Sequence, residues 1–177
     1  MEFHMMVCNI RRPLLCVVST AALLLASTAP ARADDDRAQP LQFKAGLVLS
    51  ETLAPGNLSC NAIGIITGSG HATHLGTVTL SSYDCINFSS PTAFTFRTLK
   101  DTSVVLTAAS GDQLFATYEG TAAPQPGGFL VLSGIFSFKG GTGRFAGATG
   151  TGTLDGVENI STSPASGVLV LSGRFSL

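Results

Sequence analysis

The chain has 177 residues, of which 45% are hydrophobic and only 12% are charged. Ten basic and eleven acidic side chains give a net charge of −1. Nucleic-acid-binding domains carry a basic patch, so this charge balance argues against a nucleic-acid partner. The length is that of one domain with a short additional segment.

The first 33 residues have the pattern of a secretory signal peptide. Arg11 and Arg12 supply a basic start, residues 14–26 form an apolar run, and small residues ending at Ala33 supply a cleavage site. The apolar run is shorter than the ~20 residues that a membrane-spanning helix requires. We therefore expect export to the periplasm or the extracellular space, cleavage after Ala33, and no membrane span in the mature protein.

The part that remains after cleavage begins with an acidic run. Residues 34–40 include three aspartates and end at a proline, and we interpret them as a disordered leader before a single domain at 41–177. Of the four cysteines only Cys60 and Cys85 remain. Because two cysteines in an oxidising compartment usually pair, we predict a disulfide between them.

The domain has the sequence of an all-β protein. Runs rich in Val, Ile, Leu, Phe and Thr are separated by Gly, Pro, Asn and Asp, which is typical of strands and turns. No window of a dozen residues has convincing helical periodicity. We predict strands at 41–51, 61–69, 72–82, 93–99, 102–109, 113–122, 129–138, 150–158 and 167–177.

Two of these strands repeat one pattern. Residues 129–138 read FLVLSGIFSF and residues 168–177 read VLVLSGRFSL. A glycine inside a strand often marks a bend at a barrel corner. The repeat therefore predicts two strands that are bent at their glycines and lie in equivalent environments.

Alternation along the last strand separates an apolar face from a mixed one. One packed face and one wetter face are expected of a barrel wall, and closure of the last strand against the first would remove an exposed edge. We predict a closed, eight-stranded antiparallel barrel, with an open β-sandwich as the alternative. The apolar face would carry Leu169, Leu171, Gly173, Phe175 and Leu177, and the mixed face Val168, Val170, Ser172, Arg174 and Ser176.

Residues 140–150, GGTGRFAGATG, have the glycine density of a phosphate-binding loop but not its chemistry. A Walker loop needs Lys followed by Ser or Thr after its last glycine, and a dinucleotide-binding loop must open a long helix. Here Arg144 is followed by Phe145 and then by another strand-like run. We interpret the segment as a tight corner between strands, with one helical turn at 144–148.

This corner predicts the conformation of its residues. Gly143 and at least one of Gly140 and Gly141 should have positive φ, which glycine adopts at little cost. Phe145 should be a buried plug at the barrel end. The structural motif comprises Gly140, Gly141, Thr142, Gly143, Phe145 and Gly147.

The motif also carries a family resemblance. A Gly-Gly-Thr-Gly-x-Phe run followed by a small residue and a further Gly resembles the signature late in the barrel of plant allene oxide cyclases and dirigent proteins. Exported bacterial proteins of that superfamily are more similar still, in four blocks that begin with GHATHLG at 70–76, GDQL at 111–114 and YEGT at 118–121 and end with the glycine motif.

The resemblance implies the barrel fold but assigns no catalytic residue. Allene oxide cyclases steer the conformation of a substrate in an apolar barrel, assisted by a glutamate, and dirigent proteins steer radical coupling with aspartates and an arginine. No motif in residues 41–69 matches those groups. Only the glycine corner is carried over to this chain.

The candidates for acid–base chemistry are Glu119 and Tyr118. A carboxylate that faces an apolar lumen has the raised pKa that general acid or base catalysis near neutral pH requires. Alternation places Glu119 on the face opposite Tyr118, together with Phe115 and Thr117. A solvated glutamate on the outer face is therefore the stronger interpretation.

Other polar residues have structural interpretations. His71 and His74 would fall on opposite faces of a strand and lack a third ligand nearby. We therefore predict a turn or the start of a strand, with each imidazole hydrogen-bonded locally, and no metal site. Asp112 follows Gly111 at a turn, where its side chain can cap backbone amides. Arg144 could bind an anion or close the barrel end with a salt bridge, and the salt bridge is the stronger interpretation. No nucleophile motif is present, and we predict no cofactor.

Three functions fit these features, and whether the protein is an enzyme is left open. The leading one is an exported barrel that encloses or binds an apolar small molecule. The second is an isomerase or cyclase of the allene oxide cyclase type, and the third is a structural envelope protein with a solid core, able to form homo-oligomers. A cavity above ~300 Å³ with a buried carboxylate would favour the enzyme, and the same cavity without a carboxylate would favour simple binding. A solid core would favour the structural role.

Overall fold

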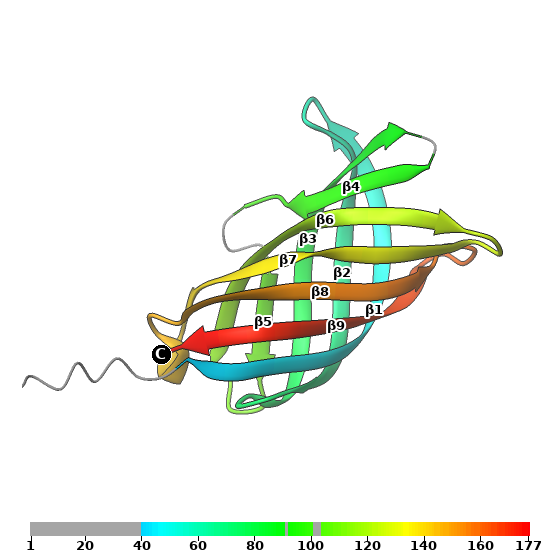
Figure 1. The fold of residues 1–177 in the computed structure, drawn as a ribbon. Coiled ribbons are helices and arrows are strands. Elements are labelled where there is room, and N and C mark those ends of the chain that lie inside the picture. Colours follow the sequence, from blue (N-terminus) through cyan, green and yellow to red (C-terminus); the bar gives the residue numbers. More distant parts are fainter. Residues whose placement is uncertain (1–39, 91, 101–103) are drawn as a thin grey trace, which may run out of the picture. The chain divides into compact units, whose positions relative to one another are not determined.

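The computed structural model describes residues 40–177 except 91 and 101–103. The predicted signal peptide at 1–33 and the leader up to residue 39 lie outside the described residues. The described part is almost entirely antiparallel β-structure with one short 3₁₀ helix, η1 (Figure 1). In chain order the elements are β1 Leu41–Asn57, β2 Cys60–Ala72, β3 Gly76–Ser90, β4 Ala93–Thr98, β5 Val104–Ala108, β6 Gln113–Gln125, β7 Phe129–Gly141, η1 Gly143–Phe145, β8 Thr149–Asn159 and β9 Ala165–Ser176.

The nine strands close into a barrel with eight positions, because β4 and β5 share one of them. Both lie between β3 and β6: β3 pairs with β5 through Val78–Ser81 and with β4 through its later residues. The remaining neighbours are β1 with β2, β2 with β3, and β6 to β9 in succession, and β9 returns to β1. The predicted closed, eight-stranded antiparallel barrel is confirmed, and the open sandwich is excluded.

The last strand is integral to the wall, as alternation predicted. Leu169, Leu171 and Phe175 of β9 are buried, whereas Val168 and Val170 are about half exposed on the outside. β9 pairs along its length with β1 on one side and with β8 on the other. Only Leu177 departs from the expected pattern, since it follows the end of β9 and is exposed.

The two repeated runs do occupy equivalent positions. Gly134 in β7 lies opposite Gly120 in β6, and Gly173 in β9 lies opposite Gly152 in β8. A Cβ on Gly134 would lie 2.9 Å from the Cα of Gly120, and one on Gly173 would lie 2.7 Å from the Cα of Gly152. At both places the neighbouring strands therefore lie so close together that only glycine fits.

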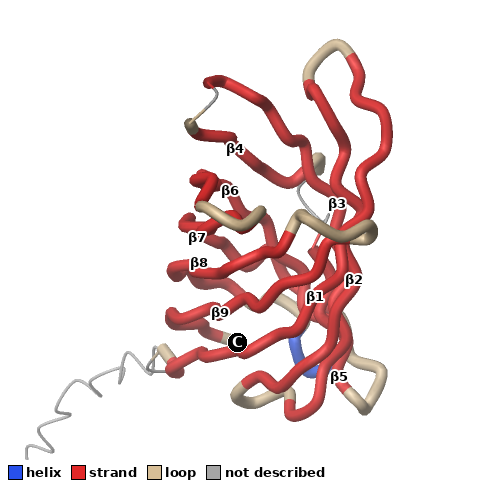
Figure 2. The backbone as a smooth tube through the Cα atoms, turned by 90° about the vertical axis from the view of Figure 1, so that its right-hand side faces the viewer, coloured by secondary structure: helices blue, strands red, loops and turns tan. Residues whose placement is uncertain are grey.

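One end of the barrel is filled by aromatic side chains around η1. Phe43, Phe136, Phe138 and Phe175 pack mostly edge to face, with ring centroids of Phe43 and Phe138 4.9 Å apart, a geometry that aromatic pairs favour. Phe145 of η1 is 1% exposed and belongs to the same buried core, so the plug is confirmed as buried. Figure 2 shows η1 at the lower end of the barrel, away from β4.

The glycine corner has the predicted backbone. Gly140 has φ of 97° and Gly143 has φ of 53°. The corner is tied to the start of β6 by hydrogen bonds between the Thr142 amide and the Gln113 carbonyl oxygen, 2.8 Å, and between the Gln113 amide and the Thr142 hydroxyl, 2.9 Å. The helical turn is shorter and earlier than predicted, at Gly143–Phe145, because Ala146 already has a non-helical backbone, with φ of −57° and ψ of 126°.

A surface ion pair covers this corner. Nε of Arg144 lies 3.6 Å from Oδ2 of Asp112, which is the salt bridge predicted for Arg144. Asp112 accepts a hydrogen bond from the Ser110 hydroxyl, 3.0 Å, and its own amide is 3.4 Å from that hydroxyl. The Asp112 side chain thus bonds a hydroxyl and a guanidinium, where backbone amides had been expected.

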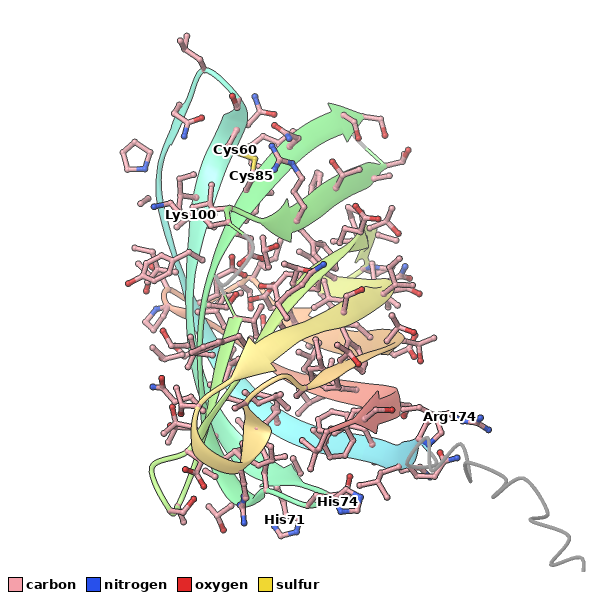
Figure 3. All side chains as sticks on the ribbon, turned by 90° about the vertical axis from the view of Figure 1, so that its left-hand side faces the viewer. Cys60, His71, His74, Cys85, Lys100 and Arg174 are labelled. Atoms are coloured by element: carbon pink, nitrogen blue, oxygen red, sulfur yellow. A yellow bond between two sulfur atoms is a disulfide. The ribbon has the colours of Figure 1, made fainter. Side chains whose placement is uncertain are left out.

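The predicted disulfide is present at the other end. Cys60 and Cys85 are bonded, with their Cα atoms 5.1 Å apart, well within the range that a disulfide can bridge. Figure 3 shows the disulfide in the upper part of the barrel, with His71 and His74 at the lower end. Among the residues described, no helix is long and apolar enough to span a bilayer.

Candidate ligand-binding cavity

The half of the barrel farther from the aromatic core encloses a cavity of about 500 Å³. This volume lies within the range of small-molecule sites. Exposed apolar side chains, among them Leu53, Phe88 and Ile160, mark its mouth. Its walls are formed mainly by buried or partly buried apolar residues: Leu49, Ile66, Leu80, Ile86, Phe94, Phe96, Ala122, Leu130, Leu132, Leu154 and Leu169.

Two buried glutamates meet within this apolar wall. Glu51 of β1 is 8% exposed and Glu158 of β8 is 3% exposed. The strand between them is β9, on which Glu51 pairs with Ala165 and Glu158 pairs with Gly167. Because both intervening residues are small, the two carboxyl groups reach each other across β9 and form a hydrogen bond.

A second glycine leaves room for Glu51 on its other side. Gly64 of β2 faces inward, and a Cβ built on it would collide with Oε1 of Glu51. On β3, the residue paired with Gly64 is Asp84, which is 4% exposed. The inward positions from β8 to β3 therefore alternate acid and glycine, in the order Glu158, Gly167, Glu51, Gly64 and Asp84.

Asp84 is joined to a chain of buried hydroxyl groups. The Tyr118 hydroxyl donates a hydrogen bond of 2.7 Å to Oδ1 of Asp84. The Ser82 hydroxyl lies 2.9 Å from the same Tyr118 oxygen and, since the Tyr118 proton points to Asp84, it is the donor in that contact. Ser82 is 0% exposed and Tyr118 9%. We call Glu51, Asp84, Tyr118 and Glu158 the acidic belt.

Burial raises the pKa values of all four belt residues. Removal from water is the largest cause and raises the pKa of Glu51 from 4.5 to about 9, assisted by the hydrogen bond and the negative charge of Glu158. Burial likewise raises the pKa of Asp84 from 3.8 to about 7, although the Tyr118 hydrogen bond opposes the shift. The pKa of Glu158 is raised by burial and that of Tyr118 lies well above 10. Low-dielectric surroundings disfavour the charged form of each group.

The hydrogen bond affects the two glutamates in opposite directions. It raises the pKa of Glu51 and partly offsets the rise that burial causes in the pKa of Glu158, so the two carboxyl groups share a proton. Oε1 of Glu51 and Oε1 of Glu158 are buried and have no hydrogen-bond partner in the structure. Such buried, unsatisfied oxygens are costly and call for a partner.

The structure separates the two residues that the sequence offered for acid–base chemistry. Tyr118 faces the cavity and belongs to the belt, whereas Glu119 is exposed on the outer face, where its strand neighbour on β4 is Arg97. His74 lies in the turn between β2 and β3, 3.1 Å from the Gln42 carbonyl oxygen. The glycine motif, at the closed end, does not line the cavity.

Glu51, Asp84 and Glu158 were not recognised from the sequence. The alternation of side chains along each strand could nevertheless have indicated them. Glu51 lies an even number of residues after the inward-facing Leu47 and Leu49, and Asp84 after Val78 and Leu80, so both side chains point inward. Glu51 had been placed at the end of its strand, whereas β1 continues to Asn57.

The arrangement suits particular kinds of chemistry. A carboxyl group with a pKa near 7 in an apolar cavity can accept or donate a proton at neutral pH. The paired glutamates can bind a proton or another cation between them. An anionic ligand group would be repelled at the belt, because among the described residues no Lys, Arg or His side chain lines the cavity. No protein-family model, no curated protein and no solved structure matches this chain.

Proposed function

We propose that this chain is an exported β-barrel protein that binds an apolar small molecule in the cavity above the aromatic core. The observation that carries the proposal is a cavity of about 500 Å³ whose walls are leucine, isoleucine and phenylalanine, interrupted by a few convergent polar groups. Binding sites for small molecules have this composition. The structural role required a solid core, whereas this barrel contains a cavity.

Export is supported by two features. The first 33 residues have the signal-peptide pattern, and the described domain holds a disulfide. Disulfides form and persist in oxidising compartments such as the periplasm and the extracellular space. We therefore propose that the ligand is met outside the cytoplasm.

Filling the cavity should abolish binding. Ala122 is buried and lines the cavity, so Ala122→Phe places a ring where the ligand would lie. Ala123→Phe is the matched control, because the next residue on the strand faces away from the cavity. Native mass spectrometry of protein purified without denaturant should show a bound apolar molecule in the wild type and in Ala123→Phe, but not in Ala122→Phe. Wild-type protein that neither retains a molecule nor binds added 1-octanol would overturn the proposal.

A second candidate function is acid–base catalysis, as in an isomerase or cyclase similar to allene oxide cyclases. The specific observation in its favour is Asp84, whose pKa of about 7 and whose hydrogen bond from Tyr118 place a proton acceptor in an apolar cavity. Under the criterion stated above, the buried carboxyl groups that line the cavity favour this function over simple binding. Binding is the step that both functions share.

This candidate predicts proton abstraction from a neutral ketone. In D₂O, the Asp84 carboxylate would take a proton from the carbon beside the carbonyl of β-tetralone, leaving the enolate. The Asp84 carboxyl group would then exchange this proton for a deuteron of the solvent and return the deuteron to the enolate carbon. Mass spectrometry should show deuterium uptake that accelerates as the pH rises through about 7, because the base must be ionised. Asp84→Asn should reduce the uptake to the uncatalysed rate, and Asp155→Asn, an exposed aspartate, should not. Equal rates in Asp84→Asn and wild type would exclude this chemistry.

A further inference from the structure

The glutamate pair contains two oxygens whose bonding partner is missing. Glu51 and Glu158 are each more than nine-tenths buried, both line the cavity, and Oε1 of each has no hydrogen-bond donor. A side-chain hydrogen bond joins the two carboxyl groups. Both residues line the cavity, so a ligand that supplied N–H or O–H donors at this point would bond carboxyl groups that the barrel leaves short of donors.

The charge at this point selects among such donors. Among the residues that the structure describes, the titratable groups that face the pair from the elements around the cavity are Asp84 on β3 and Tyr118 on β6. The inward residues on the strands next to the pair, β2, β9 and β7, are uncharged, as with Gly64, Gly167 and Leu130. All of the titratable groups are acids, so a positively charged donor is favoured over a neutral one and an anion is excluded.

The walls select the rest of the ligand. Around the belt the cavity is lined by leucine, isoleucine and phenylalanine side chains, which favour an apolar body over a hydrated ion. Phe96 and Tyr118 stand edge to face with ring centroids 5.7 Å apart, and aromatic rings attract a nearby organic cation. The described His, Cys, Asp and Glu side chains form no group of three that could hold a metal ion.

We propose that the cavity is specific for an apolar amine, whose ammonium group binds between Glu51 and Glu158 while its hydrocarbon part fills the leucine-lined space. This inference rests on the proposed function, that the cavity binds a small molecule. An alkylammonium has up to three N–H donors, enough to bond both carboxyl groups. When the amine binds, the proton shared by the two glutamates is released to solvent, so that the charge of the ammonium group replaces the charge of that proton.

Three probes with the same tail test the head-group preference: n-octylamine, 1-octanol and octanoate. Titration calorimetry of the full chain at pH 7 should give at least tenfold tighter binding for the amine than for the alcohol, and no binding of octanoate. Repeating the titration in buffers of different ionisation enthalpy should show release of up to one proton per amine. Affinity for the amine should rise from pH 5 to pH 9, because the carboxyl groups lose their protons while an alkylammonium, whose pKa resembles the ~10.4 of Lys, largely keeps its charge.

The double variant Glu51→Gln, Glu158→Gln isolates the role of the pair. It should lose the preference for the amine but still bind 1-octanol, whereas Glu119→Gln, on the outer face, should behave as the wild type. If wild-type protein binds 1-octanol as tightly as n-octylamine, the amine specificity is wrong and the binding function stands. If the wild type binds none of the three probes, the binding function and this inference are both overturned.

Discussion

Raising the pH from 5 to 9 should lower the free energy of unfolding of the barrel. The pKa of Glu51 is raised to about 9 and that of Asp84 to about 7 in the folded state, so over this range the folded protein holds protons that the unfolded chain has released. This stabilisation is fully present below the unfolded values near 4, and it is lost as the pH rises through 7 for Asp84 and 9 for Glu51. Each group contributes about 1.4 kcal/mol per pH unit while its protonation differs between the two states.

Urea unfolding at pH 5, 7 and 9, followed by circular dichroism, measures this dependence. Glu51→Gln should remove most of the decrease above pH 7 and should be more stable than the wild type at pH 9, because it no longer buries a carboxylate. Glu119→Gln alters the same residue type on the outer face and should leave the wild-type profile unchanged. A wild-type protein that is as stable at pH 9 as at pH 5 would show that the belt is not buried as described.

Phe145→Ala should destabilise the protein by about 3–5 kcal/mol, the usual cost of removing a buried aromatic ring. Phe145 is 1% exposed in the hydrophobic core at the closed end. Its surroundings cannot easily collapse onto the vacated space, because they consist of interlocked strands and rings. Thermal unfolding should show the loss as a large decrease in Tm.

Phe129→Ala is the matched control, since Phe129 is 40% exposed at the start of β7, and its Tm should stay close to that of the wild type. Ligand affinity should not change in Phe145→Ala, because Phe145 does not line the cavity. A decrease in Tm below about 2 °C for a domain of this size would contradict the plug.

The fold could be predicted because its signals are local. Alternation set the inward and outward faces of β9, and turn residues separated all nine strands. The glycine corner and the disulfide were also predictable, the first from positive-φ glycines and the second because only two cysteines remain in the domain. The lengths of the hairpins were not, since β1, β3 and β6 continue past their predicted ends to Asn57, Ser90 and Gln125. Those extensions depend on pairing with partners along the chain.

The candidate site was largely missed because it depends on register. Whether Glu51 is buried beside Glu158 is decided by Ala165 and Gly167, which lie between them on β9. Glu51 and Ala165 are more than a hundred positions apart in the chain, and one sequence carries no direct signal of such a pairing. Only Tyr118 was identified in advance, together with a neighbour, Glu119, that points away from the cavity.

Closure of the barrel through β1 and β9 has a consequence for how the chain folds. Leu41 pairs with Phe175 and Glu51 with Ala165, so the first and last strands meet only after nearly the whole domain has been synthesised. Contacts of such long range slow folding, and all-β domains of this kind fold in about milliseconds to seconds. Until then the edges of β1 and β9 are unpaired, and Glu51 and Glu158 are not yet held together across β9. Completion of the wall and assembly of the glutamate pair therefore coincide, after which the barrel has no free edge along β1 or β9.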